Sequence, residues 1–287
     1  MNRITAIITV YFPKDEHVNN IEIISKQVDR VIVCDNSNNN NAQLFIKFGN
    51  LKYYGFEQNL GLSVAFNKVL RYTSNNWNDS DFVIFFDQDS TIPNNHITKL
   101  YDCYQELVAM GHKVGCIGPV FYNLSMGKTD LPSNYEKIND HIIKIVETIG
   151  SSMLCRYQDI ESVGFWNEGL FLDMIDWDLC WRLGEKVFSC YMSYDTVMEH
   201  AVGEGKKRIL FYDIGFSNPI REYYQTRDCL YLLKENYIPV KFIFRFLIRL
   251  FNRPFVHILF LDSPLIRAKF IFRGMWDYFR NLHGEYK

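Results

Sequence analysis

Short apolar runs alternate with longer amphipathic stretches over the first 120 residues of this 287-residue chain. Runs of four to eight apolar residues are typical of buried strands, and apolar positions that recur every three or four residues are typical of helices. Such alternation predicts an α/β fold with a mostly parallel central sheet and flanking helices. We expect strands at residues 4–11, 31–34, 51–56, 82–86 and 114–121, and helices at residues 18–27, 62–72 and 95–110.

The pattern changes after residue 121. Up to residue 149 it weakens, and Gly, Pro, Ser and Asn favour loops. The last 47 residues are aromatic and basic and follow a helical pattern, with a break expected near Asn252-Arg253-Pro254 because proline interrupts helices. Between these regions we expect a helix at 176–184, a strand at 187–194 and a helix at 220–235. We therefore divide the chain into an α/β domain at 1–238 and a helical extension at 239–287.

Charge is distributed unevenly, although the whole chain carries a net charge of only −2. Residues 241–287 hold nine basic and three acidic side chains and so carry +6, which leaves −8 for residues 1–240. Phenylalanine and leucine alternate there with Arg245 and Arg249. A basic, aromatic helix of this kind can lie on an anionic membrane. The alternative is a helical pair packed on the domain. Nucleic-acid binding is disfavoured because no recognised nucleic-acid module accompanies the charges.

Cysteine and targeting signals favour a cytoplasmic protein. The seven cysteines form no Cys-x-x-Cys pair and have no histidine at zinc-site spacing, so we expect free thiols in a reducing compartment. The N-terminal segment holds one basic residue, Arg3, and no small-residue cleavage site, so no signal peptide is expected. No uncharged apolar run reaches the roughly 18–20 residues that span a bilayer.

The first candidate site is Asp87-Gln88-Asp89, directly after the apolar run at residues 82–86. Ligands of α/β folds bind at the carboxyl ends of the strands. Side chains alternate along an extended chain, so Asp87 and Asp89 point to the same side. Two such carboxylates can hold a divalent cation that also bridges to substrate phosphates. The alternative is an ordinary Asp-rich turn.

Two other segments are expected at the same edge of the sheet. Asp35 follows the strand at 31–34 and can accept hydrogen bonds from a nucleobase or a ribose, the alternative being a helix cap or an Asx-turn. Asn59 and Gly61 precede the helix at 62–72, whose N-terminus offers free N–H groups to a phosphate or a sugar. The alternative for this second segment is ordinary capping.

Three acids lie near the start of the helix at 176–184. Asp176 falls at its N-cap or first turn and can act as a general base, while Asp173 and Asp178 flank it. Arg182 can hold one of these acids in place. The alternative is a capping aspartate with a solvated acidic face.

The remaining candidates lie further along the chain. Arg227, with Tyr223 or Tyr224 on the same helix, can bind a diphosphate, and the alternative is an aromatic helix with a polar stripe. His200 is isolated, and a lone histidine is more often structural than a ligand.

The order of these motifs is more specific than any one of them. Asp-Asn-Ser, Gln-Asn-Leu-Gly-Leu-Ser-x-Ala-x-Asn and Phe-Asp-Gln-Asp-Ser are followed by Gly-Ser-Ser, Phe-x-Asp-x-x-Asp-x-Asp-x-Cys-x-Arg, a histidine and Tyr-Tyr-x-x-Arg-Asp. From residue 3 to about 235 the chain resembles family 2 glycosyltransferases of the GT-A fold. It looks most like the rhamnosyltransferase branch that builds bacterial surface polysaccharides, O-antigen and capsule among them.

The resemblance implies a role for each matching residue. Asp176 matches the aspartate that serves as the general base in the family. Many relatives carry Glu-Asp where this chain has Ile175-Asp176, so the match rests on the spacing between Asp176 and Arg182. Asp35 would contact the nucleotide base, Asp87 the ribose or the metal, and Asp89 would ligate Mg²⁺ or Mn²⁺. His200 would lie near the diphosphate or the metal, Tyr224 and Arg227 would reach the donor diphosphate, and Asn59 and Gly61 are counted with the donor-binding residues.

The resemblance also implies a reaction. It is an inverting transfer of a sugar, with L-rhamnose from dTDP-rhamnose favoured and a UDP-hexose or UDP-galactofuranose as alternative donors. The acceptor would be a saccharide linked to a lipid, as is usual in such pathways. The enzyme would lie on the inner face of the cytoplasmic membrane.

Two other classes are weaker interpretations of the same acids. A sugar-phosphate nucleotidyltransferase also uses a strand-end acid pair, but it usually carries a Gly-rich basic loop after the first strand. Here that loop is Tyr11-Phe12-Pro13-Lys14-Asp15, without glycine. A non-catalytic membrane-surface adaptor would not need the acids at positions 35, 87, 89 and 176, all of which are present.

Overall fold

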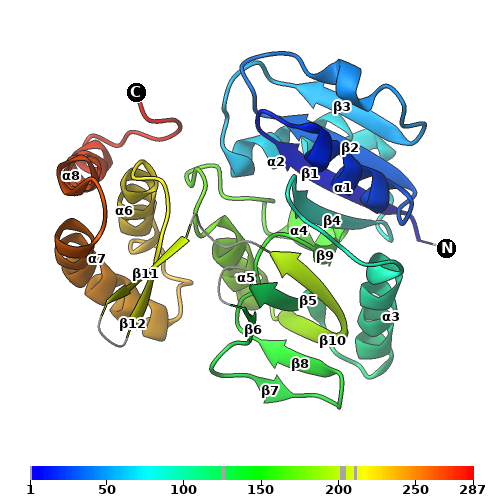
Figure 1. Ribbon diagram of the computed structural model, residues 1–287. Helices are drawn as coiled ribbons and strands as arrows, with labels where there is room; N and C mark the ends of the chain where they lie inside the picture. The colour runs from blue at the N-terminus through cyan, green and yellow to red at the C-terminus, as the bar shows by residue number, and fades with distance from the viewer. Residues whose placement is uncertain (1, 124–126, 201–204, 210–211) are drawn as a thin grey trace.

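The computed structural model describes residues 2–123, 127–200, 205–209 and 212–287 (Figure 1). A ten-stranded sheet forms its centre, and most of its strands follow the order β3-β2-β1-β4-β9-β5-β10-β8-β7. Its first half is parallel, as the α/β prediction requires. This half consists of β1 (Ile4–Val10), β2 (Arg30–Asp35), β3 (Leu51–Gly55) and β4 (Phe82–Asp87).

The second half of the sheet mixes both directions. A short strand, β9 (Met153–Arg156), lies antiparallel between β4 and β5 (Val114–Asn123), and β10 (Ser189–His200) runs parallel to β5. The expectation of loops at residues 122–149 is wrong in part, because three short strands lie there, which pair with strands close in the sequence, and the last of them also pairs with β10. They are β6 (Lys128–Asp130), β7 (Glu136–Lys137) and β8 (Ile142–Ile145).

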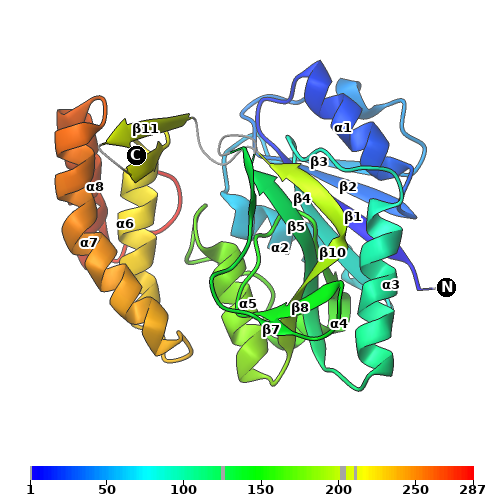
Figure 2. The same cartoon turned by 60° about the horizontal axis from the view of Figure 1, so that its bottom comes forward.

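Helices cover both faces of the sheet (Figure 2). On β4, Phe82 packs edge-to-face on Tyr101 and Tyr104 of α3, whereas Phe85 packs on Phe66 of α2. Since side chains alternate along a strand, Asp87 shares the face of Phe85. One face carries α1 (Asp15–Ser25) and α3 (His96–Ala109), with the 3₁₀ turn η1 (Ala42–Phe45) next to α1. The other carries α2 (Leu62–Tyr72), α4 (Tyr157–Ser162) and α5 (Ile175–Glu185), with the 3₁₀ turn η2 (Ser74–Asn76) next to α2.

A second body, at the left of Figure 1, follows the sheet. It contains the hairpin β11 (Gly205–Ile209) and β12 (Tyr212–Phe216) and the helices α6 (Arg221–Leu232), α7 (Val240–Phe260) and α8 (Pro264–Phe279). Gly274 of α8 lies so close to α6 that a Cβ there would be 2.7 Å from the carbonyl oxygen of Tyr223. Helices α6 and α8 are thus in contact, and the domain boundary at residue 238, which lies between α6 and α7, stays a prediction.

Helix α7 is continuous through Pro254, so the expected break at residues 252–254 is wrong. A proline inside a helix removes one hydrogen bond and crowds the preceding turn, at a cost of about 3 kcal/mol. Burial of Phe246 and His257 on either side of it offsets that cost. The chain turns later, at Ser263, which has a left-handed φ of 52°, and Pro264 then begins α8.

Helix α7 also packs on the sheet domain. Phe242 and Phe246 are buried against the indole rings of Trp177 and Trp181 on α5, with ring centroids 5.0–6.1 Å apart. No helix in the described part of the chain combines the length and the apolar character needed to cross a bilayer.

Candidate active site

The carboxyl ends of three parallel strands form one edge of the sheet. Asp35 on β2 pairs with Val10, and Asp87 on β4 pairs with Thr9 on the strand between them. Two strand spacings separate the two aspartates, about 10 Å. This edge is where α/β folds bind nucleotides.

Asp87 and Asp89 both line one cavity of about 1200 Å³. Asp87 is half-buried and Asp89 is exposed at the turn after β4. The residue between them faces away, since the Gln88 side chain accepts a hydrogen bond from the Tyr11 N–H and donates one to its carbonyl oxygen. The turn thus presents two carboxylates to the cavity, and this donor set fits a Mg²⁺ or Mn²⁺ ion, which prefers carboxylate and phosphate oxygens.

Asp176 lines the same cavity from the first turn of α5. Its Oδ2 accepts a hydrogen bond from the Gly150 N–H at 3.0 Å, and its Oδ1 accepts one from the Trp177 N–H at 2.9 Å. Burial raises the pKa of Asp176 from its ordinary value of 3.8 to about 6, and the charge of Asp87 adds to the rise. A carboxyl with this pKa is ionised at neutral pH and strong enough as a base to take a proton from a hydroxyl in the transition state.

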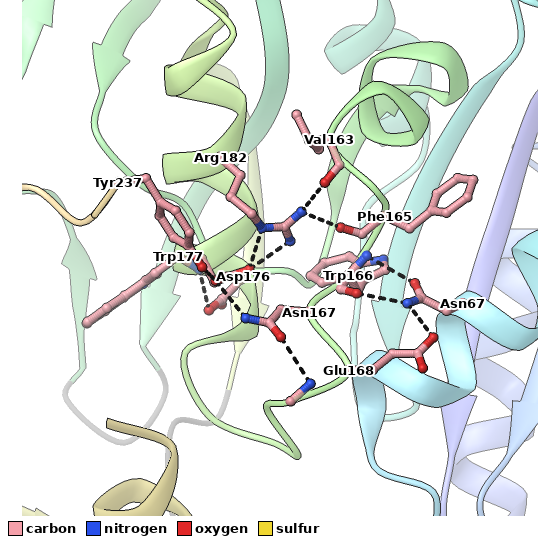
Figure 3. Close-up of polar contacts among 12 residues, drawn as sticks. Asn67, Val163, Phe165, Trp166, Asn167, Glu168, Asp176, Trp177, Arg182 and Tyr237 are labelled. Carbon is pink, nitrogen blue, oxygen red and sulfur yellow. Dashed lines mark hydrogen bonds and ion pairs between the residues drawn. The ribbon is translucent and has the colours of Figure 1, made fainter. Parts of the chain in front are cut away.

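The loop before α5 is fixed on two sides (Figure 3). On one side, Asn67 of α2 donates to the Trp166 carbonyl at 2.8 Å and accepts from the Trp166 N–H at 3.0 Å. On the other, Arg182 donates to the carbonyl oxygens of Val163 and Phe165. These contacts hold the chain that leads into Asp176.

Arg182 pairs with Asp178 and not with Asp176. Its guanidinium contacts the Asp178 carboxylate at 2.7 and 2.8 Å, and that carboxylate also accepts from Asn167 and from the Tyr237 hydroxyl at 2.6 Å. Asp178 is fully buried, so it is a structural acid. The prediction that Arg182 holds one of the three acids is confirmed, and that acid is Asp178. Asp178 lies four residues before Arg182 on the same helix, and side chains at this spacing are neighbours, which explains the pairing.

Three further residues of the cavity were not among the predicted ones. Arg221, at the start of α6, forms an ion pair with Asp173, and both line the cavity. Gly150 donates its N–H to the Asp176 carboxylate, and Ser151 exchanges a hydrogen bond of 2.6 Å with Ser90, the residue after Asp89. The Gly-Ser-Ser motif in the sequence could have identified Gly150 and Ser151 as site residues. Arg221 lies in the same segment as Arg227, which we predicted as a diphosphate ligand.

Asp35 is enclosed in this structure. It is fully buried, and its carboxylate accepts hydrogen bonds of 2.8 Å from the Ser37 N–H, the Asn41 amide and the Tyr53 hydroxyl. The Ser37 contact is the Asx-turn that was the alternative interpretation. A contact between Asp35 and a nucleobase stays a prediction.

Asn59 and Gly61 join the start of α2 to the loop before α5. The Asn59 side chain accepts from the Gly61 N–H at 3.1 Å, and the Leu62 N–H donates to the Phe171 carbonyl at 2.9 Å. Gly61 has a φ of 76°, and a Cβ there would lie 2.5 Å from that same carbonyl oxygen. Neither Asn59 nor Gly61 lines the cavity, so their contact with a donor also stays a prediction.

Tyr224 and Arg227 lie outside the cavity lining and anchor the C-terminal residues. Tyr224 stacks on Phe171 at 4.4 Å, and its hydroxyl accepts from the Tyr286 N–H. Arg227 is fully buried, bonded to Asp228 and to the Gly284 carbonyl. Their contact with a donor diphosphate stays a prediction.

His200 is the last residue of β10, and its backbone pairs with Asn123. Its side chain, which we predicted as a metal ligand, lies outside the described part of the chain.

Comparisons with known proteins agree with this arrangement. Residues 5–159 match the sequence model of Glycosyl transferase family 2. Over 253 residues the chain is 28% identical to dTDP-rhamnosyl transferase RfbF of Shigella flexneri. The matched region covers 83% of this chain and 82% of that relative.

Solved structures share the fold. TarS 1-349 of S. aureus, in complex with UDP-GlcNAc, matches 97% of this chain and 81% of its own length with a TM-score of 0.61 at 15% identity. GalNAc-T7 with UDP, GalNAc and Mn²⁺ matches 86% of this chain and 54% of its own length with a TM-score of 0.56 at 12% identity. These likenesses confirm the predicted α/β fold of GT-A type with added C-terminal helices.

Proposed function

Because this chain belongs to glycosyl transferase family 2, we propose that it moves L-rhamnose from dTDP-rhamnose onto a saccharide hydroxyl with inversion at the anomeric carbon. One observation carries the proposal beyond the family. Asp176, a carboxylate with a raised pKa, lines the same cavity as the strand-end pair Asp87 and Asp89. A base and a pair of metal ligands in one cavity are what a single-displacement transfer requires.

Asp176 acts as the general base. As the acceptor oxygen attacks the anomeric carbon, its proton passes to the Asp176 carboxylate, while the bond from that carbon to the diphosphate oxygen breaks with its electron pair. The Gly150 and Trp177 N–H groups hold the carboxylate in place during this step.

Asp87 and Asp89 would hold Mg²⁺ or Mn²⁺ in the same cavity. When bound, the ion neutralises the charge that develops on the leaving nucleoside diphosphate. Arg221, which lines the cavity beside Asp173, supplies a further positive charge on the protein itself.

The donor is assigned by similarity, since dTDP-rhamnosyl transferase RfbF covers most of this chain. The structural relative that holds UDP-GlcNAc supports a UDP-sugar as the second choice. A donor screen tests this: purified protein is given dTDP-rhamnose or UDP-sugars with Mg²⁺ or Mn²⁺, and released nucleoside diphosphate is measured. Release from none of them, together with pyrophosphate release from a nucleoside triphosphate and a sugar phosphate, would instead support a nucleotidyltransferase.

The place of the reaction is the inner face of the cytoplasmic membrane, where a lipid-linked saccharide is extended toward a surface polysaccharide such as O-antigen. Support comes from apolar side chains on α7 and α8 that are exposed to solvent and that a bilayer could bury. Each of the following is more than half exposed: Phe251, Phe255, Leu259, Leu265, Phe272, Trp276 and Phe279.

A further inference from the structure

The cavity of the candidate active site extends well beyond the acids. Its far wall is α7, which contributes Lys241, Arg245 and Arg249 to the lining. These residues are spaced four apart, so they form one stripe along the helix. At 1.5 Å per residue the stripe is about 12 Å long.

Electrostatic contacts place the start of this stripe near the base. Burial raises the pKa of Glu147 to about 7, Arg245 and Lys241 lower it, and Asp176 raises it. One carboxyl group is thus within electrostatic range of both the stripe and Asp176. Glu147 Oε2 is buried and has no hydrogen-bond partner among the described residues.

Apolar side chains continue the wall. Phe244 and Ile248 line the cavity beside the stripe, and both are more than half exposed. Arg245 lies over the Trp177 ring, 5.3 Å from its centroid, which orients the guanidinium. A wall that is cationic and apolar along the same 12 Å fits a ligand with a phosphate next to a hydrocarbon.

We propose that Lys241 and Arg245 of α7 bind a phosphate group of the acceptor, with the hydrocarbon that follows it lying on Phe244 and Ile248. This inference rests on the proposed function, because it names the chemistry of the second substrate of that site. It makes α7 a specificity element for the acceptor.

The donor diphosphate is a poorer occupant of the stripe. Its place is set by Asp87 and Asp89 at the sheet edge, whereas Lys241 and Arg245 belong to the other body of the molecule. Bulk lipid headgroups are also a poorer occupant, because these two cations line the cavity and the most exposed apolar residues of α8 do not.

The test uses the full chain and two probes with the same tail. Binding of decyl phosphate and of decyl glucoside is measured calorimetrically below their micellar concentrations, with dTDP and Mg²⁺ present to fill the donor end. The variant is Lys241→Gln with Arg245→Gln. The matched control is Lys269→Gln with Arg280→Gln, which removes two exposed cations of the same region that do not line the cavity.

We expect the wild type and the control to prefer the phosphate by about tenfold or more, and the stripe variant to lose most of that preference. Equal binding of the two probes by the wild type, or an unchanged preference in the stripe variant, would overturn the proposal. So would a loss of dTDP affinity in the stripe variant as large as its loss of phosphate affinity, since the stripe would then serve the donor.

Failure of the proposed function has a different signature. A wild-type protein that binds neither dTDP nor UDP with Mg²⁺ is not the transferase described above. The comparison of the two decyl probes is then made without nucleotide and still decides whether the stripe recognises phosphate.

Discussion

Asp87 and Asp176 face one cavity from two different layers of the fold, one at the end of β4 and the other in the first turn of α5. Burial is the main reason why the pKa of Asp176 rises to about 6, and the negative charge of Asp87 adds to it. The proposed metal site and the proposed base are therefore electrically coupled. A cation held by Asp87 would lower the pKa of the base and favour its active form.

The first prediction concerns pH. A base is active when ionised, so kcat should rise with pH and level off above the pKa of Asp176, with the acid limb near or below pH 6 when metal is saturating. The measurement is kcat from pH 4.5 to 8.5 at saturating donor and acceptor. An acid limb that is unchanged in the residual activity of Asp176→Asn would assign the ionisation to another group.

The second prediction separates Asp176 from Asp178. Asp176→Asn should lower kcat by about 10²–10⁴ with donor affinity retained. Its folded pKa is raised, so the ionised carboxylate costs stability above pH 6, and the variant should be more stable at pH 7.5 by up to about 3 kcal/mol. The gain should vanish as pH falls toward 4.

Asp178→Asn is the matched comparison. It removes the charge that Arg182 contacts in a fully buried site and should lower the free energy of unfolding by about 3 kcal/mol. Urea unfolding of both variants at pH 7.5 measures the two effects. Stability changes of the same sign would contradict the assignment of base and structural acid.

The third prediction concerns the metal ligand. Asp89→Asn removes one charge from an exposed turn and no core volume, so the melting temperature should be unchanged while metal-dependent turnover is lost. Thermal shift with dTDP and increasing Mn²⁺ provides a readout besides activity. Wild-type turnover at saturating metal would remove Asp89 from the site.

The fourth prediction concerns Gly61. Gly61→Ala should destabilise the protein by more than about 2 kcal/mol, because a φ of 76° with a ψ of 172° is strained for alanine and the new Cβ would meet the Phe171 carbonyl oxygen. Gly111→Ala is the control, with a φ of 86° and open space around it, and should cost only about 1 kcal/mol. Equal losses would show that the close approach to Phe171 carries no stability.

The fifth prediction concerns the membrane. Phe272, Trp276 and Phe279 are exposed on α8, and changing all three to serine should reduce co-sedimentation with anionic vesicles without loss of thermal stability. Ile46→Ser with Val187→Ser is the control, since those exposed apolar residues lie in turns that are far from α8 in the sequence. Unchanged sedimentation of the triple variant would leave α8 as a protein contact.

Much of the fold was predictable because local patterns determine it. The helix at 62–72 has the predicted ends, and the acid pair after β4 lies in the cavity as expected. Strand β9 was not predicted, since four residues, Met153 to Arg156, form a strand only through pairing with β4 and β5. Long-range pairing of this kind leaves no local periodicity to detect.

The site was predictable to the level of its acids but not of its arginines. Aspartates at strand ends and helix starts are placed by the elements themselves. Arg227 has a long, flexible side chain and pairs with its buried neighbour Asp228 in place of lining the cavity, whereas Arg182 pairs with Asp178, one of the three acids that the sequence offered. Arg221 reached the cavity instead, and only the tertiary structure distinguishes the three.

Helix α7 packs through Phe242 on Trp177, the residue next to the proposed base Asp176. A shortened chain that stops before Val240 would leave two indole rings in water beside Asp176, and the N–H group that orients its carboxylate would belong to an unsupported turn. Activity measured on the isolated sheet domain would then describe a differently supported base. Residues 240–287 cannot be treated as an accessory that is removed for convenience.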